Sequence, residues 1–144
     1  MCDNNIKGKI TELRCQQDFI EKGILVSQPI VADSKYDFIV DIKGKLFKVQ
    51  CKSSCLSKTE DYITMRTKSK NIRTNKESYY SKQDIDYFYT CFNNISYLVP
   101  VELAIHGETR LRFESTQPNN PNIRWAKDFE FNSMLQKMME EVSN

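Results

Sequence analysis

The chain has 144 residues, of which 40% are hydrophobic and 28% charged, and its formal net charge is +2. These values are ordinary for a globular protein, so we expect one domain over residues 1–144, with a core of its own. No segment approaches the roughly 18–20 apolar residues that cross a membrane, and the N-terminus lacks the apolar part of a signal peptide. Five cysteines without regular spacing favour a reduced, intracellular protein in the cytoplasm.

The first predicted element is a helix over residues 6–22. Apolar residues recur in it at helical spacing, which predicts a buried stripe made of Ile6, Ile10, Leu13 and Ile20. Gly23 is a candidate C-cap, because glycine readily adopts the left-handed conformation that ends many helices. A short strand over residues 24–28 then stops at Pro29.

Residues 36–52 predict a β-hairpin. Apolar side chains alternate with polar ones along both halves of this segment, as in strands with one buried face. Lys43 and Gly44 form a natural two-residue turn, and a loop of this length fixes the register. Phe38 should then face Val49, and Val40 should face Phe47.

The polar side of this hairpin collects reactive groups. In the predicted register Asp37 lies opposite Gln50, and directly opposed residues have Cβ atoms roughly 4.5–5.5 Å apart. Lys52 is two residues further along the same face. Asp41 is on this face too, but it is close to the turn and is expected in solvent. Asp33 is the alternative acid if the register differs.

The remaining elements complete a mixed α/β or α+β pattern. Residues 61–66 could extend the sheet, and Ser81 resembles an N-cap for a helix over 82–92. The strand after that helix is expected to run parallel to a neighbour. That strand covers residues 96–101. It is followed by a predicted strand over 109–113 and a predicted helix over 126–142.

A basic segment lies between residues 66 and 82. It contains six basic residues and only one acidic residue, Glu77, with serine, threonine and asparagine between them. This composition predicts a mobile loop that contacts the phosphates of a nucleic acid. A solvated loop without a partner is the alternative. The expected contact residues are Lys48 on the hairpin and Lys68, Lys70 and Arg73 in the loop.

The hairpin resembles the signature of the PD-(D/E)XK nuclease superfamily, with an acid on one strand and (D/E)-x-K on the next. Here the motif reads Asp37, then Gln50-Cys51-Lys52. Glutamine replaces the second acid, as in a subset that includes a group I intron homing endonuclease. Further segments are similar to that group over about residues 8–130: Thr11-Glu12, Tyr79 to Phe88, Tyr97 to Pro100, Leu111 to Phe113 and Asn122 to Ala126.

This resemblance implies a restriction-endonuclease-like core, with a mixed sheet flanked by helices, and a catalytic group of Asp37, Gln50, Lys52 and Glu12. The expected ligands for Mg²⁺ or Mn²⁺ are the side chains of Asp37, Glu12 and Gln50 and the main-chain carbonyl of Cys51. Lys52 would orient the attacking water or offset charge in the transition state. Tyr80 and Asp84 match recurrent positions, where they would support the site or pack locally.

The expected partner is double-stranded DNA, without a role at a membrane. One site in so small a domain cuts one strand, so a double-strand break requires a homo-oligomer, as a dimer or tetramer. Apolar residues near the C-terminus could supply the contact, although they could also pack on the chain's own sheet. Arg112, Arg124 and Trp125 are further candidates for DNA contact, although a place in the core or in an interface is favoured for Trp125.

Three function classes remain open at this stage. They are a homing-type DNA endonuclease, a nuclease for branched DNA such as a Holliday junction resolvase, and a DNA-binding module that has lost catalysis. The glutamine at position 50 keeps the third class open. His106 is the one histidine, and no cysteine pair has zinc-ligand spacing, so a structural zinc site is unsupported.

Overall fold

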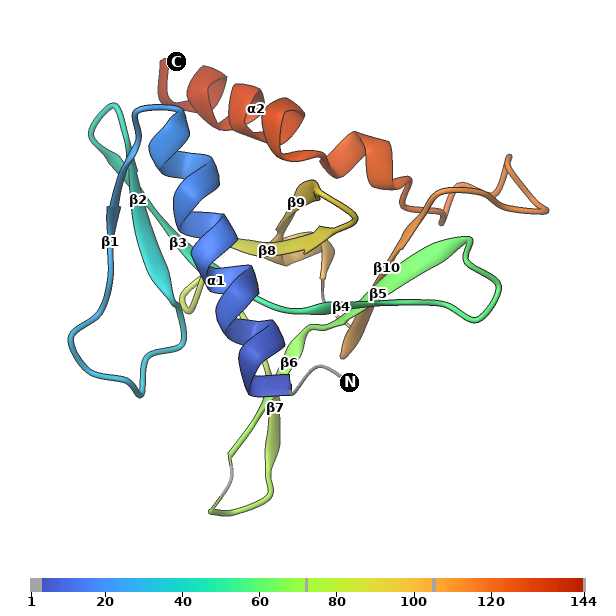
Figure 1. The fold of residues 1–144 in the computed structure, drawn as a ribbon, viewed down its shortest axis with the longest axis horizontal. Coiled ribbons are helices and arrows are strands. Elements are labelled where there is room, and N and C mark those ends of the chain that lie inside the picture. Colours follow the sequence, from blue (N-terminus) through green and yellow to red (C-terminus); the bar gives the residue numbers. More distant parts are fainter. Residues whose placement is uncertain (1–3, 72, 105, 144) are drawn as a thin grey trace.

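A five-stranded mixed sheet, in the order β1-β2-β3-β8-β9, forms the centre of the fold (Figure 1). The structure is a computed structural model, and it describes residues 4–71, 73–104 and 106–143. β3 and β8 are parallel, and the other neighbours in the sheet are antiparallel. The five strands are β1 (Leu25–Ser27), β2 (Phe38–Ile42), β3 (Lys45–Cys51), β8 (Tyr87–Phe92) and β9 (Ile95–Pro100).

Two helices, α1 (Asn4–Glu21) and α2 (Phe131–Ser143), cover one face of this sheet (Figure 1). The predicted apolar stripe of α1 is wrong, because all four of its members are exposed. The residues that α1 buries are Thr11, Cys15 and Phe19. They are four residues apart, so they form a single face of the helix. Gly23 ends the helix as predicted, with a φ of 75°.

A second, three-stranded sheet in the order β10-β5-β4 packs against the other face through a separate apolar cluster. Residues 61–66 were expected to extend the main sheet, but they form β5 of this second sheet instead. Its strands are β4 (Ser54–Leu56), β5 (Tyr62–Arg66) and β10 (Glu108–Arg112). Two short 3₁₀ helices connect these parts, η1 (Val101–Leu103) and η2 (Ala126–Phe129).

The hairpin of β2 and β3 has the predicted register, with Phe38 opposite Val49 and Val40 opposite Phe47. Its turn residues, Lys43 and Gly44, both have positive φ, at 53° and 91°. Two positive φ angles are typical of the tight turn that matches the twist of a hairpin. Asp41, expected in solvent, accepts a hydrogen bond of 2.8 Å at Oδ1 from the Gly44 N–H and thereby stabilises this turn.

The predicted helix over residues 82–92 is wrong. Ser81 and Asp84 form a single turn, in which the Asp84 N–H donates to the Ser81 carbonyl, and the chain then enters β8. β8 is a central strand between β3 and β9 and contributes to the cores on both faces. The strand parallel to a neighbour is therefore β8, whereas β9, expected to be the parallel strand, is antiparallel.

The basic segment forms a small hairpin rather than a loop. β6 (Lys68–Lys70) pairs with β7 (Glu77–Tyr79), and this hairpin projects from the body of the molecule (Figure 1). Glu77 binds both Arg66, at 3.0 Å, and Lys68, at 2.7 Å. In the part of the chain that the structure describes, no helix is long and apolar enough to cross a membrane.

Candidate active site

Asp37 stands at the point where the chain enters β2. Its backbone N–H donates to the Val49 carbonyl at 2.9 Å, and its Oδ2 accepts from the Cys51 N–H at 2.8 Å. The Gln50 side-chain amide lies 2.8 Å from the Lys35 carbonyl oxygen and 3.2 Å from Asp37 Oδ2, and its nitrogen satisfies both acceptors. Asp37 and Gln50 therefore lie side by side, and both the amide and the backbone of β3 orient the carboxylate.

Glu12 reaches the same place from the first helix. It lies one residue after the buried Thr11, and its side chain is 25% exposed, with an ion pair of 3.3 Å to Lys9. Its negative charge raises the pKa of Asp37. The helix thus brings a second carboxylate to the end of the hairpin.

The pKa of Asp37 is about 6, raised from an ordinary value of 3.8. Burial is the main cause, and the neighbouring carboxylate of Glu12 adds to it. The Cys51 N–H and the positive charge of Lys52 act in the opposite direction, but they do not prevail. A half-buried carboxylate beside a second acid is a site with excess negative charge, which a cation would relieve.

Lys52 directly follows β3, and its backbone N–H donates to the Tyr89 carbonyl at 2.9 Å. Its Nζ lies 5.3 Å from the centre of the Tyr80 ring, a distance at which the cation and the ring attract each other. Burial lowers the pKa of Lys52, the charge of Arg66 lowers it further, and Asp37 opposes both. Lys52 is thus a confined cation within electrostatic reach of Asp37.

These groups fit a hard divalent cation. Carboxylate, amide and carbonyl oxygens are the ligands that Mg²⁺ and Mn²⁺ prefer, and Asp37, Glu12, Gln50 and the Cys51 carbonyl offer them. Within the described residues, no group of three or more His, Cys, Asp or Glu side chains is arranged to hold a metal. The carboxylates that the structure brings together here are those of Asp37 and Glu12.

The residues that are expected to contact a nucleic acid lie in two parts of the structure. Lys48 lies on β3, where its Nζ donates to the Gln83 carbonyl and stands 6.0 Å from the Tyr36 ring centre. Lys70 and Arg73 are exposed on the projecting hairpin, whereas Lys68 is held by Glu77. Asp33 is exposed in the loop before β2, away from the contacts that orient Asp37.

One contributor to the site region was not predicted from the sequence. Asp86 accepts from the Lys48 N–H at 2.8 Å through Oδ2, and its own N–H donates to the Lys48 carbonyl at 2.8 Å. Asp86 also pairs with Lys82 at 3.1 Å. It thereby joins β3 to the start of β8. An acid directly before a run of aromatic residues could have indicated a strand entry of this kind.

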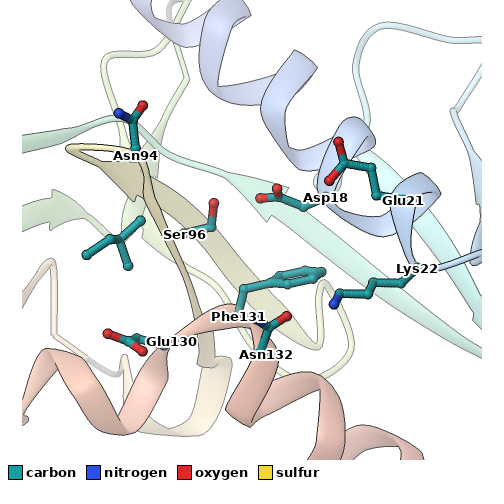
Figure 2. Close-up of a pocket in the computed structure, with 9 residues that line it drawn as sticks. Asp18, Glu21, Lys22, Asn94, Ser96, Glu130, Phe131 and Asn132 are labelled. Atoms are coloured by element: carbon teal, nitrogen blue, oxygen red, sulfur yellow. The ribbon is translucent and has the colours of Figure 1, made fainter.

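A separate pocket of about 340 Å³ lies between the end of α1, the β8–β9 turn and the start of α2 (Figure 2). Asp18, Glu21, Lys22 and Ser96 are among its lining residues. Beside it, the buried Tyr89 hydroxyl donates to Asp18 and is 2.9 Å from Ser96 Oγ. Burial and the bond to Asp18 raise the pKa of Tyr89 well above its usual range. None of the predicted site residues lines this pocket.

A metal-dependent phosphodiesterase needs carboxylates for its ion and a positive group near the phosphate, and such groups are offered by Asp37 and Lys52 at neighbouring strand ends and by Glu12 on α1. The sequence model of the PD-(D/E)XK endonuclease family matches residues 2–132, so the chain belongs to this family. The resemblance drawn from the Asp37 and Gln50-Cys51-Lys52 motif is thereby confirmed, and with it the class of enzyme, a nuclease. Family membership also implies a DNA substrate and a divalent metal.

The fold agrees with this assignment. A solved bacterial homing endonuclease, I-Ssp6803I, is similar over 99% of this chain and 97% of its own, with a TM-score of 0.79 and 21% sequence identity. The predicted mixed α+β core of the restriction-endonuclease type is confirmed. The solved structure of MepB aligns over 90% of the chain with a TM-score of 0.38 and 15% identity. No curated protein matches the sequence significantly.

Proposed function

We propose that this chain is an endonuclease that hydrolyses phosphodiester bonds of double-stranded DNA with Mg²⁺ or Mn²⁺, and that it is of the homing type. The observation that carries the proposal is the convergence of Glu12, Asp37 and Lys52 in a member of the PD-(D/E)XK endonuclease family. The homing type is supported by likeness of fold to I-Ssp6803I over almost the whole of both chains.

In this proposal each residue has a distinct task. Asp37 and Glu12 hold the divalent ion, with Gln50 and the Cys51 carbonyl beside them. When bound, such an ion supplies an activated water and charge stabilisation for phosphate hydrolysis. Gln50 keeps Asp37 in position through the contact of 3.2 Å to Oδ2. Lys52 faces the scissile phosphate and offsets the negative charge that develops there. The ring of Tyr80 restricts the position of the Lys52 ammonium group.

A homo-oligomer is also part of the proposal, because one site cuts one strand. The C-terminal apolar residues do not provide the spare surface expected of them, since Phe131, Met134, Leu135 and Met138 are buried in the chain's own core. A different apolar surface is available on α1, where Ile6, Ile10, Leu13 and Ile20 are 47–58% exposed. This exposed stripe is the candidate contact with a second copy.

The experiment that tests the function compares substrates. Purified protein with Mg²⁺ is given randomised linear duplexes, a four-way junction of matched length and single strands, and the cleavage products are mapped. Cutting at a defined duplex sequence supports the homing type. Preferred cutting of the junction would instead indicate a resolvase, and metal-independent binding without cleavage of any substrate would indicate a non-catalytic module.

A further inference from the structure

The outer face of the second sheet carries a set of residues that the proposed catalytic site does not use. Ile63 and Met65 of β5 and Leu111 of β10 are buried in the core, so the alternate residues of both strands point outward. Arg66 lies opposite Glu108 across the two strands, and the next outward pairs follow from the register. These pairs are Thr64 with Arg110 and Tyr62 with Arg112.

Tyr62 is the centre of this face. The Arg110 and Arg112 guanidinium carbons lie 4.9 Å and 4.6 Å from the centre of its ring. Arg112 is also bound by Asp61 at 3.3 Å, and Arg110 Nε lies 3.7 Å from Glu108. Two arginines are thus held at fixed places by one ring and two acids, and a side chain fixed before binding loses less entropy when a ligand arrives.

The Arg110 fork is available for a ligand. Its side chain is 53% exposed, and among the described residues no hydrogen bond engages its terminal nitrogens. Beside it lies a pocket of about 260 Å³, which combines arginine and asparagine side chains. Glu108 and Ile123 also line it, and the rest of its lining is Arg110, Arg112, Arg124, Asn120 and Asn122. These are the two residue types that pair bidentately with guanine and adenine edges.

The face is continuous with the catalytic site. Arg66, at the end of β5, is near enough to Lys52 for their charges to interact, and it is also bound by Glu77 on the projecting hairpin. From Arg66 the outward residues lead along β5 and β10 toward the pocket. A duplex that crossed the catalytic lysine could therefore also cover this face.

This face has less net positive charge than a surface that binds phosphates. Its arginines are accompanied by three acids, Asp61, Glu77 and Glu108, which weaken the attraction for phosphates of any sequence. The projecting hairpin has a larger excess of positive charge, because Glu77 is the acid that faces Lys68 and Lys70 there, and the exposed Arg73 lies beyond it in the chain between the two strands. Arginine side chains that are held in a fixed orientation, on a surface with little net positive charge, suit the recognition of base edges.

We propose that the face formed by Tyr62, Arg110 and Arg112, with its adjoining pocket, reads base edges of double-stranded DNA in the major groove. The inference rests on the proposed endonuclease function and adds a specificity-determining surface to it. β10 is an edge strand of the three-stranded sheet and β5 is its neighbour, and proteins that read DNA through a β-sheet place such strands in a groove of the duplex. The narrow major groove of duplex RNA does not admit such strands.

The test uses the full chain with Asp37→Asn and no added metal, so that binding is measured without cleavage. Sequences retained from a pool of randomised duplexes are determined for this protein and for three further variants in the same background: Arg110→Ala, Arg110→Lys and Arg112→Ala. Lys137→Ala, an exposed cation on α2, is the matched control. Thermal melting of each variant confirms that it is folded.

We expect both Arg110 variants to lose preference at the same one or two base pairs, by roughly tenfold, as befits loss of one bidentate contact. Arg110→Lys keeps the charge but loses the fork, so its affinity for the unselected pool should stay within about twofold. Lys137→Ala should select the same sequences as its parent.

Unchanged base preference in the Arg110→Ala and Arg112→Ala proteins would overturn the inference. Uniform weakening on all sequences would also overturn it, because that result marks a phosphate contact. So would stronger competition by duplex RNA than by DNA. Failure of the endonuclease proposal is recognised separately, by cleavage assays on the otherwise unmodified chain.

Discussion

The Cys51 backbone N–H donates a hydrogen bond of 2.8 Å to Asp37 Oδ2, and thereby fixes the carboxylate at the start of β2 against the end of β3. Lys52 is the next residue of the chain, so the same short segment orients the acid and carries the lysine. Glu12 approaches from α1 and raises the free energy of the ionised Asp37. Burial, the larger cause, and the Glu12 charge thus both disfavour the negative charge of Asp37 before any cation binds.

Removing that charge should stabilise the metal-free protein. The pKa of Asp37 is about 6 in the folded state and 3.8 in the reference state, so the folded protein binds this proton more tightly than the unfolded chain. The resulting destabilisation is fully present above pH 6 and disappears as the pH falls toward 4. We expect Asp37→Asn to raise the unfolding free energy at pH 8 by at most about 3 kcal/mol.

Urea denaturation in the presence of EDTA at pH 4.5 and pH 8 checks this expectation. The gain from Asp37→Asn should be present at pH 8 and small at pH 4.5. Asp33→Asn, which changes an exposed acid in the preceding loop, is the control and should give no gain at either pH. A loss of stability for Asp37→Asn at pH 8 would show that the ionised carboxylate stabilises the fold.

Gln50→Glu should strengthen metal binding and weaken the metal-free fold. A third carboxylate beside Asp37 and Glu12 adds a hard ligand, but it replaces the amide donor that contacts Asp37 at 3.2 Å. We expect the Kd for Mg²⁺ to fall by about tenfold in calorimetric titration, with a lower melting temperature in EDTA. Equal Mg²⁺ affinity in the two proteins would place Gln50 outside the metal site.

Substitution of Thr90, on β8, is expected to stabilise the fold. Thr90 follows Tyr89, and Tyr89 pairs with Cys51 at the end of β3 and accepts the Lys52 N–H at its carbonyl, so Thr90 is close in the chain to the contact that holds Lys52. Its hydroxyl is fully buried, and no hydrogen-bond partner lies among the described residues. Thr90→Val should therefore raise the unfolding free energy by about 1–3 kcal/mol, whereas Thr90→Ser should not. A destabilised Thr90→Val protein would reveal a partner for the hydroxyl.

The basic hairpin should control the salt dependence of DNA binding. Each lysine or arginine on a phosphate contributes a slope of roughly −0.9 in log affinity against log salt. Replacing Lys70 and Arg73 with alanine should make the slope shallower by about 2 in fluorescence anisotropy. Lys68→Ala should change it less, since Glu77 already neutralises Lys68. An unaltered slope in the double variant would mean that the hairpin does not touch DNA.

Sequence reasoning succeeded where local signals were sufficient. The β2–β3 hairpin is encoded by its alternation and by a two-residue turn, both readable within 17 residues of sequence. It therefore fixed the pairing of Phe38 with Val49, and with it the neighbourhood of Asp37, Gln50 and Lys52. The helix over 126–142 was also found, although η2 separates its first turn from α2 at Phe131.

Prediction from the sequence failed where the burial of a residue depends on elements far away in the chain. In α1 the exposed isoleucines outweigh the buried Thr11 and Cys15 in hydrophobicity, so the apolar stripe indicated the wrong face. The aromatic run of β8 is hydrophobic on both faces because the two helices cover one face of the main sheet and the second sheet covers the other, and such a run has no period-2 signal. Glu12 was placed in the site only by family resemblance, since nothing local predicts how α1 crosses the sheet.

Lys52 and Asp37 belong to one catalytic site in the proposed function, and a single cleavage measurement tests this most directly. Supercoiled plasmid carrying a mapped target is incubated with Mg²⁺ and wild-type, Lys52→Ala or Lys137→Ala protein, with binding followed in parallel. We expect Lys52→Ala to cleave at least about 100-fold more slowly with affinity within a few-fold of wild type, and Lys137→Ala to cleave normally. Full cleavage by Lys52→Ala would contradict the account.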